Sequence, residues 1–348
     1  MRILLTFLVY IVALNTVLFS QTGGENIFPF LDLDYSARNS SLGRNYIAVN
    51  DDDINLAVTN PSLLSEEMHN NIGFNQSIHA GGINQGMVVY GRNMFGGTGA
   101  VHLRYIAYGE MDRTDKTGEV IGTFSAGDFV LGAGFGKQIN PRISVGGNFN
   151  VIWSQLEAFN SFGLAVDLGG TYHFEDGRTV ASALVRNAGA QLTKYNMEDR
   201  APTYANAMIG VTHKLEHAPF RLGIVAHNLN RWDLTYSDPN LEATTDPLSG
   251  ELVEPETAGF GEKLGQHFIA QVEVVAGKSV RIRGAFDYHR RRSFVVENRP
   301  AMAGFSFGAG FNFKRFSIDY GLVVFSSAGF NNLITLTTNF DKWKNKAN

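Results

Sequence analysis

The sequence predicts an all-β protein, a 14-stranded antiparallel outer-membrane β-barrel with an N-terminal plug segment in the lumen. Three observations predict this fold. Apolar and polar residues alternate along most of the chain after residue 70, as in strands with one face toward lipid and the other toward a wet interior. Short and long connections between these strands alternate. Aromatic residues reach 12% and charged residues only 18%, below the roughly 25% of an ordinary soluble domain.

Composition excludes several other classes of protein. The mean hydropathy of -0.08 is far too low for a helical membrane protein, because only alternate residues of a barrel strand need to be apolar. The net charge of -4 provides no basic surface for nucleic acid. The chain has no cysteine, so it is not a disulfide scaffold. No cofactor is expected from its motifs.

Residues 1–20 are typical of a signal peptide. Arg2 is followed by a short apolar core, and Ser20-Gln21 is a suitable cleavage junction. The alternative is an uncleaved anchor, which the short core disfavours. Without Arg2 the chain keeps 28 basic and 33 acidic residues, so its net charge becomes -5.

Residues 21–70 precede the alternating region and are interpreted as the plug. They contain the stretch AVNDDDINLAVTNPSLLS, Ala48 to Ser65. Repulsion among Asp51, Asp52 and Asp53 favours a solvated turn, a helix N-cap or a position near inward-facing arginines. Asn60-Pro61 is expected to turn the chain toward the first strand, because a residue before proline is disfavoured in a helix. The expected role of these residues is structural.

The barrel is predicted over residues 71–340. In SFGLAVDLGGTYHF, Ser161 to Phe174, one face is aliphatic and aromatic and the other is small and polar. In SVRIRGAFDYH the polar face includes Arg281, Arg283 and Asp287. A soluble β-sandwich is the alternative, but its outer face would carry more charge than this one does. The strands are predicted to begin near Asn71, Gln85, Gly99, Gly127, Arg142, Phe159, Arg178, Tyr204, Pro219, Gln266, Ser279, Ala301, Arg315 and Phe330.

The connections support this even strand number. MFGG, QINP, EDG, EHA, AGK and KR are short and fit periplasmic turns, whereas GEMDRTDKTGEV and the stretch from Arg231 to Lys263 fit outer loops. The last strand is predicted to end at Phe340. Residues 341–348 then form a basic periplasmic tail.

Motifs that could carry chemistry lack the context that they need. GFSFG, Gly304 to Gly308, matches a hydrolase nucleophile elbow, but it lies inside an alternating strand instead of a strand-to-helix turn. HKLEH, His213 to His217, falls at a strand end and turn, where two histidines four apart do not share a metal as they would on a helix. The three aspartates lack the glycine and glutamate of a calcium-binding loop. Neither catalytic nor metal-binding residues are therefore predicted.

Two resemblances go beyond these patterns. YSARNSSLGRNYIAVNDDDINLAVTNPSLLS resembles the N-terminal signature of FadL-like outer-membrane barrels, although Ser62 replaces the alanine of their Asn-Pro-Ala motif. Within that superfamily the chain is similar to the PorQ family of the type IX secretion system. The stretches that carry this second resemblance are SARNSSLGRNYIAVNDDDINLAVTNPSLLSEEMHN, GEMDRTDKTGEVIGTFSAGDF, NSFGLAVDLGGTYH and HAPFRLGIVAHNLNRWDLTY.

The PorQ resemblance implies an outer-membrane barrel without enzymatic activity, in a Bacteroidetes-type cell. It implies a role in the cell-surface attachment complex, where the barrel holds a PorZ-like surface protein. A PorU-like sortase and a PorV-like barrel would belong to the same complex, and cargo would be attached to lipopolysaccharide. The alternative is a FadL-like passage for hydrophobic small molecules, which the small, polar inward face disfavours.

A scaffold is expected to contact its partner through its outer loops, since loops often carry function. The longest loop is the first candidate, and the loop from Arg290 to Pro300 is the second. The alternative is that these loops only cover the barrel mouth. The candidate partner-binding residues are Arg231, Trp232, Tyr236, Asp238 and Pro239.

Overall fold

The computed structural model describes residues 26–79, 82–195, 203–235, 244–245, 252–253, 258–277, 279–294, 302–326 and 329–344. The predicted signal peptide and three candidate loop residues, Tyr236, Asp238 and Pro239, lie outside these ranges. Within the ranges, no helix is long and apolar enough to span a membrane.

A closed antiparallel barrel of fourteen strands confirms the predicted fold class. Neighbouring strands follow chain order around the wall, and β1 pairs with β16 to close it, from Asn71↔Asn339 to Ile78↔Asn332. The strands of the wall are β1 (Asn71–Ile78), β2 (Asn84–Met94), β3 (Gly97–Thr114), β4 (Val120–Asn140), β5 (Ile143–Leu156), β6 (Phe159–His173), β7 (Thr179–Thr193), β8 (Asn206–Lys214), β9 (Phe220–Ala226), β12 (Phe268–Ala276), β13 (Val280–Asp287), β14 (Phe305–Asn312), β15 (Phe316–Ser326) and β16 (Gly329–Asn339).

Side chains alternate along each strand as the lipid-and-lumen pattern requires. In β6, Phe162 and Leu168 point outward and are 44% and 64% exposed, whereas Ser161 and Asp167 point inward and are buried. The outward face of the wall is therefore an apolar belt, and the inward face meets other protein atoms.

The two ends of the barrel differ in their connections. At the end that we call the turn end, six short turns join the strands, and the two longest of them run only from residue 174 to 178 and from residue 215 to 219. The opposite end, the loop end, carries the long connections between β7 and β8, β9 and β12, and β13 and β14. Four connections at the loop end are also short, those after β1, β3, β5 and β15.

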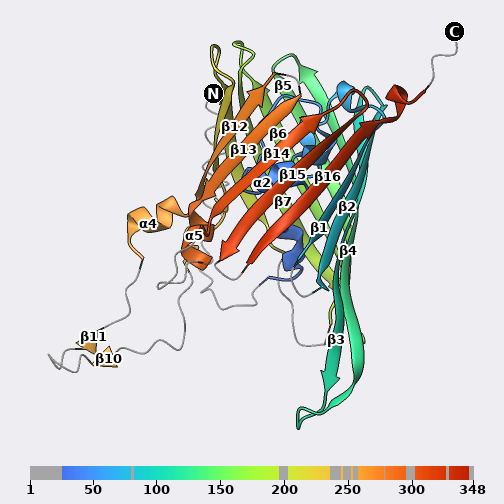
Figure 1. The fold of residues 1–348 in the computed structure, drawn as a ribbon, viewed down its shortest axis with the longest axis vertical. Coiled ribbons are helices and arrows are strands. Elements are labelled where there is room, and N and C mark those ends of the chain that lie inside the picture. The colour runs from blue at the N-terminus through green and yellow to red at the C-terminus, as the bar shows by residue number, and fades with distance from the viewer. Residues whose placement is uncertain are drawn as a thin grey trace.

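One predicted outer loop is wrong. The stretch GEMDRTDKTGEV is not a loop, because β3 and β4 continue past the barrel as a paired hairpin from Glu110↔Ser125 to Thr114↔Val120. A tight turn joins the two strands of this hairpin. In the turn, Asp115 Oδ1 accepts hydrogen bonds from the backbone N–H groups of Thr117 and Glu119. The hairpin extends well beyond the other strands (Figure 1).

Further elements at both ends of the barrel differ from the prediction. Strand β13 ends at Asp287, where helix α5 (Tyr288–Phe294) begins, and β14 begins at Phe305 instead of Ala301. The longest loop contains helix α4 (Phe260–Gly265) and a two-stranded pair, β10 (Thr244–Thr245) with β11 (Leu252–Val253). At the opposite end Phe340 begins a 3-10 turn, η5 (Phe340–Lys342), after the last strand.

Residues 26–70, the N-terminal segment, form five short helical elements. These are η1 (Pro29–Asp32), α2 (Ala37–Ser41), α3 (Ile54–Ala57), η2 (Pro61–Leu63) and η3 (Glu66–Met68). Figure 1 shows α2 inside the ring of strands. Hydrogen bonds join the segment to inward-facing wall residues, as from Ala37 N–H to Thr335 Oγ1 (2.9 Å) and from Thr212 Oγ1 to the Ala48 carbonyl (2.7 Å).

The inner wall is less uniformly polar than the alternation suggested. Apolar inward side chains pack under the N-terminal segment in several clusters, which together bury much apolar surface. In one of them, Phe28 and Leu31 cover Ile152 of β5 and its neighbours on β3, β4 and β6. The prediction of a small, polar interior is therefore wrong for these patches.

Candidate functional site

The three consecutive aspartates have three different environments. Asp53 caps α3, since its side chain accepts a hydrogen bond from the Asn55 N–H at 3.1 Å. Asp51 Oδ2 lies 2.6 Å from the Arg38 guanidinium. Asp52 is exposed, and its carbonyl accepts a bond from the Asn71 side chain at the start of β1. The stretch therefore holds α2, α3 and the first strand together.

Charge stabilises the ionised form of Asp51. Burial raises the cost of ionisation, but the guanidiniums of Arg38 and Arg221 outweigh it and hold the pKa of Asp51 below its ordinary value. Asp53 Oδ2 lies 3.3 Å from Arg38 as well. Arg38 is thus held by two carboxylates of its own segment.

The wall supplies the other half of an ion-pair network. Glu273 of β12 lies at its centre: one carboxylate oxygen is 3.2 Å from Arg38 and 2.6 Å from Arg221, and the other is 2.9 Å from Arg283. Arg283 also contacts Asp319 at 2.6 Å. We define the ion-pair network as Arg38, Asp51, Asp53, Arg221, Glu273, Arg283 and Asp319. Three guanidiniums and four carboxylates are therefore joined between the N-terminal segment and one side of the wall, where they come from β9, β12, β13 and β15.

Sequence reasoning identified part of this network. It placed Arg283 on the inward face and named Asp51 and Asp53, but it missed Arg38, Glu273 and Arg221. The alternation of apolar and polar residues could have identified Glu273 and Arg221, because each occupies an inward position between outward apolar residues. Nothing in the local sequence of Arg38 distinguishes it, because its partners are 13 or more residues away.

The Asn60-Pro61 turn lies against the wall. Asn60 caps η2 by accepting from the Ser62 N–H, and its amide donates to the Ile47 carbonyl at 2.7 Å. Pro61 packs so closely on β5 that a Cβ at Gly146 would overlap its backbone. The turn therefore needs a wall position without a side chain.

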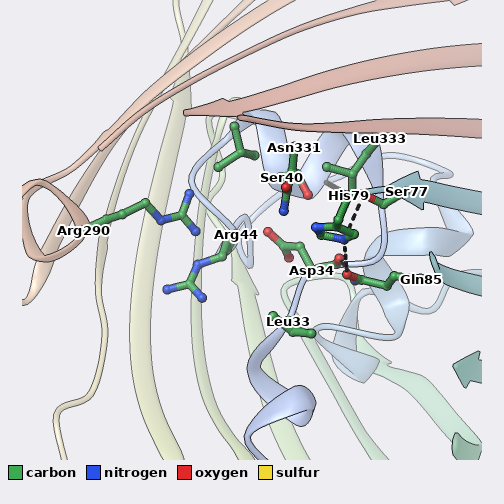
Figure 2. A pocket seen from close by; sticks show the side chains of 11 residues that line it. Leu33, Asp34, Ser40, Arg44, Ser77, His79, Gln85, Arg290, Asn331 and Leu333 are labelled. Carbon is green, nitrogen blue, oxygen red and sulfur yellow. Dashed lines mark hydrogen bonds between the residues drawn. The ribbon is translucent and has the colours of Figure 1, made fainter. Parts of the chain in front are cut away.

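A small cavity lies between the N-terminal segment and the loop end. Its volume of about 40 Å³ is enough for roughly three water molecules. Asp34, Ser40 and Arg44 line it, with Arg290 of α5 reaching in from the loop end (Figure 2). The Oδ2 of Asp34 and the hydroxyl of Ser40 are buried without a hydrogen-bond partner. Burial raises the pKa of Asp34 to about 6, against the opposing effect of Arg44.

Only two of the five candidate loop residues are described. Arg231 donates to the Asn26 side chain at 2.9 Å and lies over the Tyr204 ring, so it holds the start of the N-terminal segment at the loop end. Trp232 is 51% exposed, and its ring packs at a tilt against Phe260 of α4.

The rejected motifs have ordinary structural positions. Ser306 of GFSFG is the second residue of β14 and is fully buried, so it does not lie on a strand-to-helix turn. His213 lies in β8 and His217 in the following turn. No group of three or more potential metal ligands occurs among the described residues.

Comparisons with known proteins establish the fold. The chain resembles the toluene transporter TodX of Pseudomonas putida, with a TM-score of 0.53, 10% identity, and coverage of 89% of this chain and 99% of TodX. For the monoaromatic hydrocarbon channel CymD the TM-score is 0.50 at 11% identity, covering 88% and 97% of the two chains. No family model matches the chain, and no curated protein sequence matches it.

These likenesses are between structures, not sequences. They show that the chain has the fold of outer-membrane barrels of the TodX type, which agrees with its apolar outer belt. TodX is a transporter and CymD is a channel. The predicted membership of the PorQ family and the predicted surface partners stay predictions.

Proposed function

We propose that this barrel is a non-enzymatic anchor that holds a surface protein at the outer membrane. The observation that carries the proposal is the ion-pair network, which ties the N-terminal segment directly to β9 and β12 and, through Glu273 and Arg283, to β13 and β15. A buried network of this kind is costly to break, since each removed charge leaves others unpaired. Such an interior suits a rigid support better than a passage that must open.

The specific partner is proposed from the sequence resemblance. A PorZ-like surface protein would be held at the loop end, alongside a PorU-like sortase and a PorV-like barrel. The elements proposed for this contact are α5 and the long connections between β7 and β8, β9 and β12, and β13 and β14. Lipopolysaccharide would surround the barrel in the outer leaflet.

Affinity purification from outer membranes, combined with secretion in a deletion strain, tests the anchor. We expect a surface protein to co-purify with the barrel and to be released into the medium when the barrel is absent. Cargo should then keep its uncut C-terminal signal. Normal cargo processing in the deletion strain, with no co-purifying surface protein, would exclude this function.

The loop contribution can be tested separately. Removing Ser237 to Glu256 should lower retention of the surface protein if the longest loop forms the contact. The matched control is a barrel that lacks the hairpin extension from Glu110 to Ser125. Unchanged retention after the loop deletion would exclude that loop as the contact.

The second candidate is a passage for hydrophobic small molecules, and the solved neighbours favour it over the anchor. TodX is described as a toluene transporter and CymD as a monoaromatic hydrocarbon channel. The apolar inner patch under Phe28 and Leu31 is an observation in its favour. Uptake of radiolabelled toluene by cells with and without the barrel tests it. Equal uptake rates would exclude this second function.

A further inference from the structure

An exposed aromatic surface lies beside the barrel at its loop end. The rings of Trp232 and Phe260 pack at a tilt with centroids 5.3 Å apart, and both residues are more than half exposed. Leu264 follows Phe260 by one helical turn, so the two residues occupy the same face of α4. We define Trp232, Phe260 and Leu264 as the aromatic platform. Their exposure requires an explanation, because large apolar groups on one surface mark an interaction site.

The charged residues of α4 point elsewhere and hold the helix in place. Lys263 Nζ is 2.6 Å from an oxygen of Asp233, next to Trp232 in the chain. Glu262 pairs with Arg292 of α5. The helix is therefore amphipathic, with its apolar face free and its polar face tied to neighbouring elements.

The platform is continuous with the surface that faces lipid. Trp232 packs against His267, with ring centroids 5.9 Å apart, and the next residue, Phe268, begins the outward face of β12. On the paired strand β9, the outward residue Ile224 is followed by the exposed Leu229 just beyond the strand. Exposed apolar side chains thus occur on the ends of β9 and β12 and on the adjoining connection that leads to α4.

Position also favours lipid over a protein that covers the barrel mouth. Figure 1 shows α4 projecting sideways from the wall at the loop end instead of over the lumen. Tryptophan is enriched at this depth of membrane proteins, where an apolar ring meets a polar boundary.

We propose that the aromatic platform lies in the headgroup region of the outer leaflet and anchors the connection between β9 and β12 to lipid. The base of this connection, which the sequence analysis assigned to a protein partner, would then lie against the membrane. This inference is independent of the proposed function.

Tryptophan fluorescence tests the proposal, because the chain has only three tryptophans. The variant W153F/W343F leaves Trp232 as the single reporter in the full-length barrel. In phosphatidylcholine–phosphatidylglycerol vesicles, lipids brominated close to the headgroup should lower its emission roughly twofold. Lipids brominated near the chain ends should lower it less, and aqueous iodide should have little effect.

Two controls calibrate the measurement in the same barrel. The variant W232F/W343F keeps Trp153, which faces outward from β5 and should be quenched by brominated lipid. The variant T117W/W153F/W232F/W343F places its reporter at the hairpin tip, which iodide should reach. F260S/L264S added to W153F/W343F should make Trp232 more accessible to iodide.

Strong iodide quenching of Trp232, equal to that at the hairpin tip, with no effect of brominated lipid would overturn the proposal. Protection that appears only after an outer-membrane extract is added would also overturn it, in favour of a protein contact. Heat-modifiable migration in gels verifies that each variant is a folded barrel before the comparison is made.

Discussion

At the scale of single residues, Glu273 has the greatest expected effect on stability. It is 1% exposed and is the shared partner of three guanidiniums. Glu273→Gln should destabilise the barrel by about 3–5 kcal/mol, because it leaves buried positive charges without their counter-charge. The temperature at which the folded band is lost in heat-modifiability gels measures this.

The control is Glu175→Gln, which removes an exposed ion pair with Arg142. Exposed pairs contribute about 0–1 kcal/mol, so the melting temperature should barely move. Equal effects of the two substitutions would contradict a structural role for the ion-pair network.

Asp34 gives the second residue-scale prediction, which concerns pH. Its pKa is raised to about 6 from an ordinary 3.8, first because of burial. The folded state therefore favours the protonated carboxyl. This stabilisation is complete below about pH 4 and is lost as the pH rises through 6. Asp34→Asn should flatten this part of the stability profile and raise stability above pH 7 by roughly 1–2 kcal/mol.

Thermal melts of both proteins from pH 4 to 8 provide the measurement. The parent should lose stability between about pH 4 and 6 relative to the variant. Parallel profiles would show that Asp34 does not titrate in this range.

At the scale of elements, close packing of the Asn-Pro turn on the wall can be tested at glycines. Gly146→Ala should destabilise the barrel by about 1–3 kcal/mol, because the new Cβ would overlap the backbone of Pro61. Gly170→Ala on the neighbouring strand is the matched control, since its Cβ would meet nothing closer than 4.0 Å. Similar melting temperatures for the two variants would mean that the turn does not lie against β5.

The environment of each strand decides how well the sequence predicts it. Strands were predictable because lipid outside and protein inside impose opposite preferences on alternate residues, as Phe162 and Asp167 show. The β3–β4 extension was missed because beyond the membrane neither face must be apolar, so GEMDRTDKTGEV looks like a loop. The ion-pair network was only partly predictable. Alternation says that Arg283 points inward, but not that Arg38, on a segment distant in sequence, meets the same glutamate.

At the scale of the whole molecule, the N-terminal segment is predicted to seal the lumen. Barrels of about fourteen strands enclose an interior that water fills unless something occupies it. Deleting residues 26–70 should therefore give a barrel with large, steady conductance in planar bilayers, whereas the parent should be nearly silent. A folded deletion barrel that conducts no better than the parent would contradict a sealing role.

The position of Asn55 has a consequence for how the molecule is assembled. Its amide donates to Thr337 of β16 at 2.9 Å, and its carbonyl oxygen accepts from Asn75 of β1 at 2.8 Å. One residue from the first fifth of the chain thus bridges the first and last strands to be synthesised. Its site does not exist until the final strand has arrived, because contacts of such long sequence separation form late. We therefore expect ring closure to be coupled to burial of the N-terminal segment around Asn55, and an intermediate that lacks β16 should leave that part of the segment open to proteases.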